Sequence, residues 1–270
     1  MYNNYIYKDY NKYLLEKYVV KPHKNSRYAT QGVTQVNDAV FITYYDTDKL
    51  KNSIVDIVRN DKHITLELDN KSHVGGISYS KEYNKVFISN NRFVNTYDLD
   101  EINNLNHGDT LRYENKIKVH EDVEIASYLT VFDNKLYIGR FNKDKATKLA
   151  IYNINDDGIL FSNLIDVPFK KVQGLAIYKY QNNVYYIFST SYGRSSTSSI
   201  IITKLIDNKF NKLKEIVIPS MCEQISINDK ELMIAFESDC SKYNIPFITS
   251  SRSRMDNIMF LDIEKILADC

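Results

Sequence analysis

Residues 173–189, QGLAIYKYQNNVYYIFS, contain the sequence pattern on which the fold of this chain depends. A polar residue and a glycine precede a β-rich run, a short polar turn follows, and a second β-rich run ends in a small residue. Aliphatic and aromatic residues fill both runs, and turn-forming residues separate them. This combination predicts a β-hairpin.

The same hairpin pattern occurs five times along the 270 residues. Its copies begin at Gln31, Gly75, Ser127, Gln173 and Glu223. We predict third strands at Ser53–Ile57, Val94–Leu99, Leu149–Ile154, Ile200–Lys204 and Ile258–Ile263. Four copies have a fourth strand, at Ile64–Leu68, Ile117–Val119, Ile159–Ile165 and Glu215–Ile218. A β repeat with a period of about 40–50 residues is typical of a β-propeller.

The fourth strand of the last repeat is predicted at the other end of the chain. Leu14–Val20 reads as a strand, so we expect it to complete the last blade and close the ring, which removes exposed sheet edges. The sequence therefore predicts an all-β protein: a single five-bladed β-propeller with four-stranded antiparallel blades. We place the blades at about residues 31–68, 73–119, 124–165, 172–218 and 222–267, the last completed by residues 14–20.

The composition of the chain argues against some classes of binding partner. With 35 basic and 34 acidic residues, the chain has no general electrostatic attraction to nucleic acid or an anionic membrane. No apolar run reaches the about 18 residues of a membrane span, and the N-terminus does not resemble a signal peptide. We expect a soluble monomer, extracellular if the chain is a processed form or a fragment and cytoplasmic otherwise. The three cysteines do not form a disulfide framework.

Candidate binding residues follow from the propeller geometry. The linkers into the inner strands and the loops between second and third strands lie on one face of a propeller and surround its central mouth. From these segments we predict ligand-binding residues Gln31, Tyr45, His73, Tyr128, Arg140, Gln173, Tyr192, Arg194, Glu223 and Glu237. Equivalent positions differ from blade to blade, which indicates one asymmetric central site rather than one site per blade.

Each of these residues also has a structural interpretation. The two glutamines could bridge adjacent blades by hydrogen bonds to the backbone, and His73 could be a structural histidine. The two arginines could pair with carboxylates at the rim, and the tyrosines could be packing residues. The functional alternatives are an arginine clamp on a carboxylate, a phosphate or sugar hydroxyls, and aromatic faces that contact sugar rings.

Catalytic candidates are fewer. Glu223 and Glu237 flank the hairpin of the last blade and could act as an acid–base pair, with His73 or Asp46 assisting. A register slip of one residue would put the two carboxylates on opposite faces, and a structural role or cation binding is an alternative. No nucleotide-binding or metalloprotease motif occurs, and the five histidines lack ligand spacing, so we expect no metal and no cofactor.

Two levels of resemblance support the same fold. The repeat layout resembles five-bladed propellers in general, which include tachylectin-type lectins and several glycoside hydrolase families. The lectins have identical blade sites, which this chain lacks, and the hydrolases spread their catalytic carboxylates over three blades. A set of motifs is more specifically similar to a group of propellers from Gram-positive bacteria: Gln31-Gly32, residues 73–76, residues 128–131, Gln173-Gly174, residues 191–194 and Glu237-Ser238.

Three hypotheses about function remain at this stage. The first is a binding module for a small polar ligand, a glycan or cell-envelope fragment, which could be the receptor-binding part of a secreted effector such as a toxin or bacteriocin. The second is a glycoside-hydrolase-like enzyme that uses carboxylates at the mouth. The third is a platform for protein–protein interaction. We favour binding over catalysis.

Overall fold

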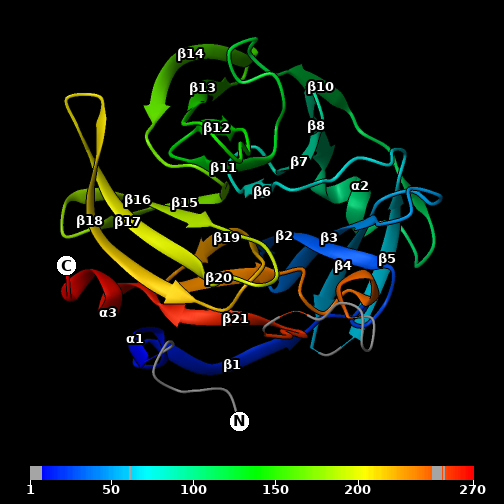
Figure 1. Ribbon diagram of the computed structural model, residues 1–270. Coiled ribbons are helices and arrows are strands. Elements are labelled where there is room, and N and C mark those ends of the chain that lie inside the picture. Colours follow the sequence, from blue (N-terminus) through cyan, green and yellow to red (C-terminus); the bar gives the residue numbers. More distant parts are fainter. Residues whose placement is uncertain (1–7, 61, 245–250, 252) are drawn as a thin grey trace.

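The computed structural model is a ring of five β-sheets around a central axis (Figure 1). It describes residues 8–60, 62–244, 251 and 253–270. Each sheet has four antiparallel strands, and blade 1 carries one additional strand. The predicted single five-bladed β-propeller is therefore confirmed. Among the described residues, no helix has the length and apolar character needed to span a membrane.

The blades follow one another in chain order. Blade 1 comprises β2 (Tyr28–Val36), β3 (Ala39–Asp46), β4 (Ile54–Arg59) and β5 (Lys62–Leu68). Blade 2 comprises β6 (Ile77–Ser80), β7 (Lys85–Asn90), β8 (Phe93–Asp98) and β10 (Asn115–Lys118). Blade 3 comprises β11 (Tyr128–Phe132), β12 (Lys135–Gly139), β13 (Thr147–Asn155) and β14 (Gly158–Val167). Blade 4 comprises β15 (Val172–Tyr180), β16 (Asn183–Thr190), β17 (Ser198–Ile206) and β18 (Lys209–Ile218).

Blade 5 is built from both ends of the chain. It comprises β19 (Cys222–Asn228), β20 (Glu231–Phe236), β21 (Asn257–Asp262) and β1 (Leu14–Val20). The N-terminal strand β1 lies antiparallel beside β21, with Tyr18 opposite Met259, as Figure 1 shows for the blue and red strands. The expected closure of the ring by residues 14–20 is thus confirmed.

A buried ion pair fastens this closure. The Lys21 ammonium, at the end of β1, pairs with the Asp239 carboxylate and donates a hydrogen bond to the Phe236 carbonyl over 2.8 Å. Both charged side chains are buried, and burial lowers the pKa of Lys21 and raises that of Asp239. An exposed pair, Lys17 with Glu231 at 2.6 Å, joins β1 to the β19–β20 hairpin.

The structure also contains short helices and one strand in addition to the four strands of each blade. Helices α2 (Leu99–Asn103) and α3 (Ile263–Ala268) each follow a third strand, and α1 (Lys8–Asn11) precedes β1; a 3₁₀ turn, η1, covers Ser241–Tyr243. The chain after α2 forms β9 (Thr110–Leu111), which pairs in parallel with β5 of the neighbouring blade. The sequence did not predict this strand, because two residues are too short for a periodic signal.

The axis is crowded where the inner strands begin. A Cβ on Gly32, Gly75, Gly76 or Gly174 would lie 2.3–2.7 Å from an atom of another strand. Glycine is therefore required at these four positions for the close approach of the blades.

One buried glutamine links the blades at the axis. The Gln224 amide donates to the carbonyls of Ile77 and Leu129, and its oxygen accepts from the backbone N–H groups of Ile77 and Val33. Gln224 of blade 5 thereby contacts blades 1, 2 and 3. The sequence suggested this structural role for Gln31 and Gln173, which instead face the mouth.

Candidate functional site

A cavity of about 420 Å³ lies at the central mouth of the propeller. Seven of the ten predicted binding residues line it: Gln31, Tyr45, His73, Arg140, Gln173, Glu223 and Glu237. They come from all five blades, and no two blades contribute the same set. A concave volume of this size with a few converging polar groups suits a small ligand.

Three of the polar side chains are directed by β-bulges. The register shifts at Thr30/Gly32, at Val172/Gly174 and at Cys222/Ile225, each at the start of an inner strand. Gln31, Gln173 and Glu223 occupy the extra positions. A bulge turns a side chain that regular alternation would direct elsewhere, and bulges occur often beside functional sites. The bulge at Glu223 also answers the register question, because it leaves Glu223 on the same face as Glu237.

The carboxyl groups of Glu223 and Glu237 both line the cavity, and each affects the pKa of the other. Glu223 is only 5% exposed. Burial raises the pKa of Glu223 well above its usual range, and the neighbouring Glu237 charge raises it further. Burial also raises the pKa of Glu237, to about 7. Ionisation of one buried carboxyl group opposes ionisation of its neighbour, so the pair keeps its protons to a higher pH than free glutamate does.

Two glutamine side chains donate hydrogen bonds to this pair of carboxyl groups. Gln173 Nε2 donates to Glu223 Oε1 over 3.0 Å, and Gln31 Nε2 donates to Glu237 Oε2 over 3.3 Å. Gln31 also donates to the Thr30 carbonyl at 2.9 Å, which holds its side chain in place. The amide oxygens of these residues are available to accept hydrogen bonds from hydroxyl or amine groups.

An aromatic group forms one wall of the cavity. The rings of Tyr45 and His73 lie 4.1 Å apart between centroids, and Tyr243 lines the same cavity. Solvent reaches the His73 ring, yet partial burial lowers its pKa, and the charges of Lys49 and Lys242 lower it further. His73 is therefore a neutral imidazole at pH 7, able to donate or accept one hydrogen bond.

Arg140 stands at the rim. Its Nη1 lies 2.6 Å from an oxygen of Glu124, whose side chain is 58% exposed. The sequence left open a rim salt bridge or a ligand clamp for this residue, and the structure shows the salt bridge. Because Glu124 is so exposed, a ligand could take its place on the guanidinium at little cost.

Three predicted binding residues do not line this cavity. Tyr128 is fully buried, and its ring fills the space that Gly139 leaves on the paired strand. Tyr192 lies outside it, 47% exposed at a neighbouring groove. Arg194 is exposed at the tip of the loop between β16 and β17 and does not border the cavity either.

The catalytic candidate Asp46 has a structural environment. Its carboxylate pairs with Arg27 and accepts hydrogen bonds from the backbone N–H groups of Leu50 and Lys51 at 2.9 and 2.7 Å. The bond from Arg27 holds the Asp46 pKa well below its usual range. Asp46 does not border the cavity, so it organises the loop after β3 rather than facing a ligand.

Other lining residues were absent from the predicted set. Tyr243 belongs to the 3₁₀ turn Ser241–Tyr243, and Phe141 follows Arg140 directly. The place of Tyr243 after the second strand of its blade did indicate a position near the mouth. Only its nearness in sequence to Arg140 could have pointed to Phe141.

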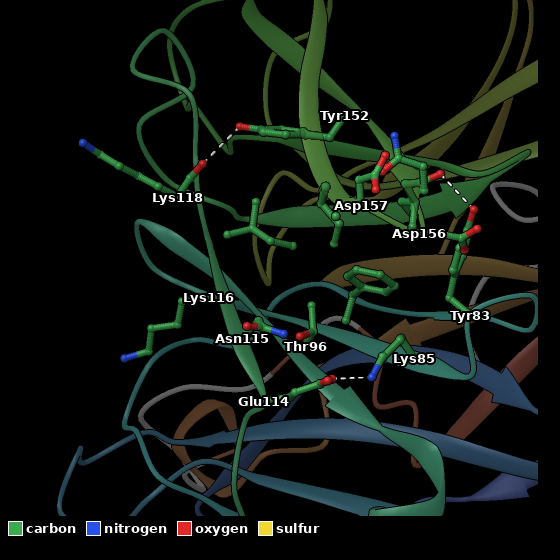
Figure 2. A pocket seen from close by; sticks show the side chains of 16 residues that line it. Tyr83, Lys85, Thr96, Glu114, Asn115, Lys116, Lys118, Tyr152, Asp156 and Asp157 are labelled. Atoms are coloured by element: carbon green, nitrogen blue, oxygen red, sulfur yellow. Dashed lines mark hydrogen bonds and ion pairs between the residues drawn. The ribbon is translucent and has the colours of Figure 1, made fainter.

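A larger cleft of about 700 Å³ lies between blades 2 and 3 (Figure 2). Its polar groups make bonds within the protein. Tyr83 donates to the Ile154 carbonyl at 3.1 Å, Tyr152 donates to the Lys118 carbonyl at 3.3 Å, and Lys85 pairs with Glu114. The two tyrosines each join one blade to the next. We therefore regard this cleft as part of the blade interface rather than as the principal site.

Comparison with known proteins identifies the architecture alone. No known protein family and no curated protein matches the sequence. Glutaminyl cyclase from Myxococcus xanthus is similar in structure, with a TM-score of 0.55, 9% identity, and coverage of 91% of this chain and 96% of that chain. A protein described as a putative glucose dehydrogenase from Thermus thermophilus has a TM-score of 0.52 at 9% identity, covering 91% and 100%. An α-L-arabinofuranosidase from Clostridium thermocellum has a TM-score of 0.50 at 10% identity, covering 83% and 87%. This chain thus has a propeller fold that is similar to those of enzymes with different activities.

Proposed function

We propose that the central cavity binds a small, hydroxyl-rich ligand, such as the terminal sugar of a glycan or a cell-envelope fragment. The observation that carries this proposal is the convergence of three bulge-directed side chains, Gln31, Gln173 and Glu223, on one cavity. Amides and carboxyl groups with raised pKa values can both donate and accept hydrogen bonds, as the hydroxyl groups of a sugar require. The Tyr45 and His73 rings add an aromatic wall.

Glycoside hydrolysis is the second candidate, and the same carboxyl pair favours it over other reactions. Glycosidases hold their two carboxyl groups about 5–10 Å apart, with the scissile bond between them. Glu223 and Glu237 both lie on the hairpin of blade 5, and each already accepts a hydrogen bond from a glutamine amide. Binding leaves these two bonds in place, whereas hydrolysis requires the carboxyl groups to act on the substrate directly, so we favour binding over this mechanism.

A glycan array followed by calorimetric titration tests the proposal. We expect the wild-type protein to bind a neutral glycan, and Glu237→Gln to weaken binding by roughly tenfold or more, since hydrogen bonds to charged groups are worth about 1.5–3 kcal/mol. Glu82→Gln, at an exposed turn outside the cavity, is the matched control and should bind normally. Mass spectrometry of the recovered glycan checks for cleavage.

Two results would count against binding of a neutral glycan. One is that a folded wild-type sample binds no glycan on the array. The other is equal affinity of wild type and Glu237→Gln for every glycan that binds. Cleavage that Glu223→Gln abolishes would replace the binding proposal with the hydrolase.

A further inference from the structure

A second groove, of about 590 Å³, lies beside the central cavity between blades 3 and 4. Four lysines border it: Lys143, Lys170, Lys171 and Lys212. Only two carboxylates, Asp144 and Glu215, share this lining, and Glu215 is already paired with Lys212. The groove therefore has an excess of positive charge in a protein whose overall net charge is only +1.

Three of these lysines have no carboxylate partner. Lys143, Lys170 and Lys171 make no ion pair within the part of the chain that the structure describes. Lysines that converge without acidic partners repel one another, and an anion bound between them relieves that repulsion. The charge pattern thus indicates a negatively charged ligand.

The groove is a built structure and not a chance gathering of mobile side chains. The Lys171 backbone N–H donates to the Asn142 carbonyl at 2.8 Å, and its carbonyl accepts from the Ser191 N–H at 3.1 Å. These two bonds join the linker between β14 and β15 to the loops on either side. Lys171 has φ of +58°, a left-handed conformation that is unfavourable for lysine and that the surrounding structure must hold.

One further group in the groove points to a ligand. Tyr192, 47% exposed, lines the same groove, with the Lys171 ammonium 4.4 Å from its ring centroid. An exposed aromatic ring beside lysines suits a sugar that carries a negative charge.

We propose that the groove between blades 3 and 4 is a second binding site, for a phosphate or carboxylate group carried on a sugar ring. The anion lies among Lys143, Lys170 and Lys171, and the sugar contacts Tyr192. This site does not depend on the function proposed for the central cavity. The same two segments border both places, since Phe141 and Gln173 line the cavity while Lys143 and Lys171 line the groove.

Calorimetric titration with glucose 6-phosphate, glucuronate, glucose and inorganic phosphate tests the proposal at low salt. We expect both acidic sugars to bind, glucose to bind more weakly, and added sodium chloride to weaken binding of the acidic sugars. The variant Lys143→Ala with Lys170→Ala should lose about 2- to 25-fold in affinity, because each exposed charge pair contributes about 1.4- to 5-fold. Both side chains are exposed, so the variant should fold.

The controls separate this groove from other sites. Lys179→Ala with Lys209→Ala removes two exposed lysines from the opposite end of blade 4 and should bind like wild type. Tyr192→Leu should weaken the sugar phosphate more than inorganic phosphate. Equal affinity for glucose 6-phosphate and inorganic phosphate would overturn the sugar contact.

The central cavity gives the last comparison. Glu237→Gln should leave binding of the acidic sugars unchanged. If Glu237→Gln abolishes that binding while the Lys143/Lys170 variant retains it, the acidic sugar occupies the central cavity and the groove proposal is wrong. The groove proposal is also wrong if neither glucose 6-phosphate nor glucuronate binds at millimolar concentration. That outcome does not affect the proposal for neutral glycans.

Discussion

At the scale of single residues, burial decides which candidates have chemistry to offer. Glu223 and Glu237 are ordinary glutamates in the sequence, but burial within the protein raises the pKa of both carboxyl groups. Asp46 was as plausible a candidate, and Arg27 together with the backbone of its own loop stabilises its charge instead. Carboxyl groups thus have opposite pKa shifts in the two environments.

The carboxyl pair predicts a pH-dependent stability. Burial raises the pKa of Glu237 to about 7, so the folded protein retains a proton that the unfolded chain releases above about pH 4.5. This contribution to stability is complete below about pH 4.5 and is lost as the pH rises through 7. We expect urea unfolding to show that Glu237→Gln loses less stability than wild type between about pH 5 and pH 8, by on the order of 3 kcal/mol.

The difference between variant and wild type is the informative quantity. His73, with its lowered pKa, also contributes to the pH dependence, with stability lost as the pH falls, and subtraction removes that common part. Glu82→Gln should follow the wild-type curve. Parallel curves for wild type and Glu237→Gln would show that Glu237 does not hold a proton in the folded state.

At the scale of secondary-structure elements, two local features shape the molecule. The bulges at the starts of β2, β15 and β19 direct polar side chains into the mouth. Strand β1 closes the ring, and the buried pair of Lys21 with Asp239 holds its end. The alternation of apolar and polar residues does not reveal a bulge. The closing strand could be predicted, because the last repeat lacks a fourth strand of its own.

The closing strand predicts unequal costs for two lysines. Lys21→Met leaves the Asp239 carboxylate buried without its partner, so we expect a loss of about 3–5 kcal/mol in the free energy of unfolding. Lys17→Met, in the same strand but in an exposed pair, should cost about 0.2–1 kcal/mol. Urea denaturation measures both.

A double variant checks the cause. Combining Lys21→Met with Asp239→Leu removes the unpaired charge and should recover much of the lost stability, because a buried ion pair can be replaced by apolar residues at little cost. Equal losses for the Lys17 and Lys21 variants would contradict the assigned role of the buried pair.

At the scale of the whole molecule, the repeat builds a nearly symmetric ring around an asymmetric mouth. Blade cores are formed by equivalent strands, but each blade contributes different side chains to the central cavity. One strand of the ring comes from the far end of the chain. Stability of the ring therefore depends on a contact between residues more than two hundred positions apart.

Removal of residues 1–20 should open the ring. Without β1, the edge of β21 is exposed and available for pairing with other chains. We expect a lower melting temperature and oligomers in size-exclusion chromatography. A peptide of residues 12–22 added in trans should restore the elution volume of the intact chain by strand addition, and a scrambled peptide should not. A truncated chain that keeps the elution volume and the melting temperature of the intact chain would show that β1 is dispensable.

Much of the fold could be predicted because its signals are local. Strands alternate with a period of two, turns use characteristic residues, and five copies reinforce one another, so the blades and their closure were readable from the sequence. The entries to inner strands and the loops after second strands lie on one face of the ring, so seven predicted residues were placed correctly at the mouth: Gln31, Tyr45, His73, Arg140, Gln173, Glu223 and Glu237. Whether they bind a ligand stays a prediction.

Only the tertiary structure decided the rest. It turned Tyr128 into the core opposite Gly139 and brought Phe141 to the cavity. It gave Gln224 the bridging role at the axis, and it gathered the lysines of the groove from three separate segments. The physical reason is that strand patterns depend on neighbouring residues, whereas bulges, loop paths and pKa shifts depend on contacts between distant ones.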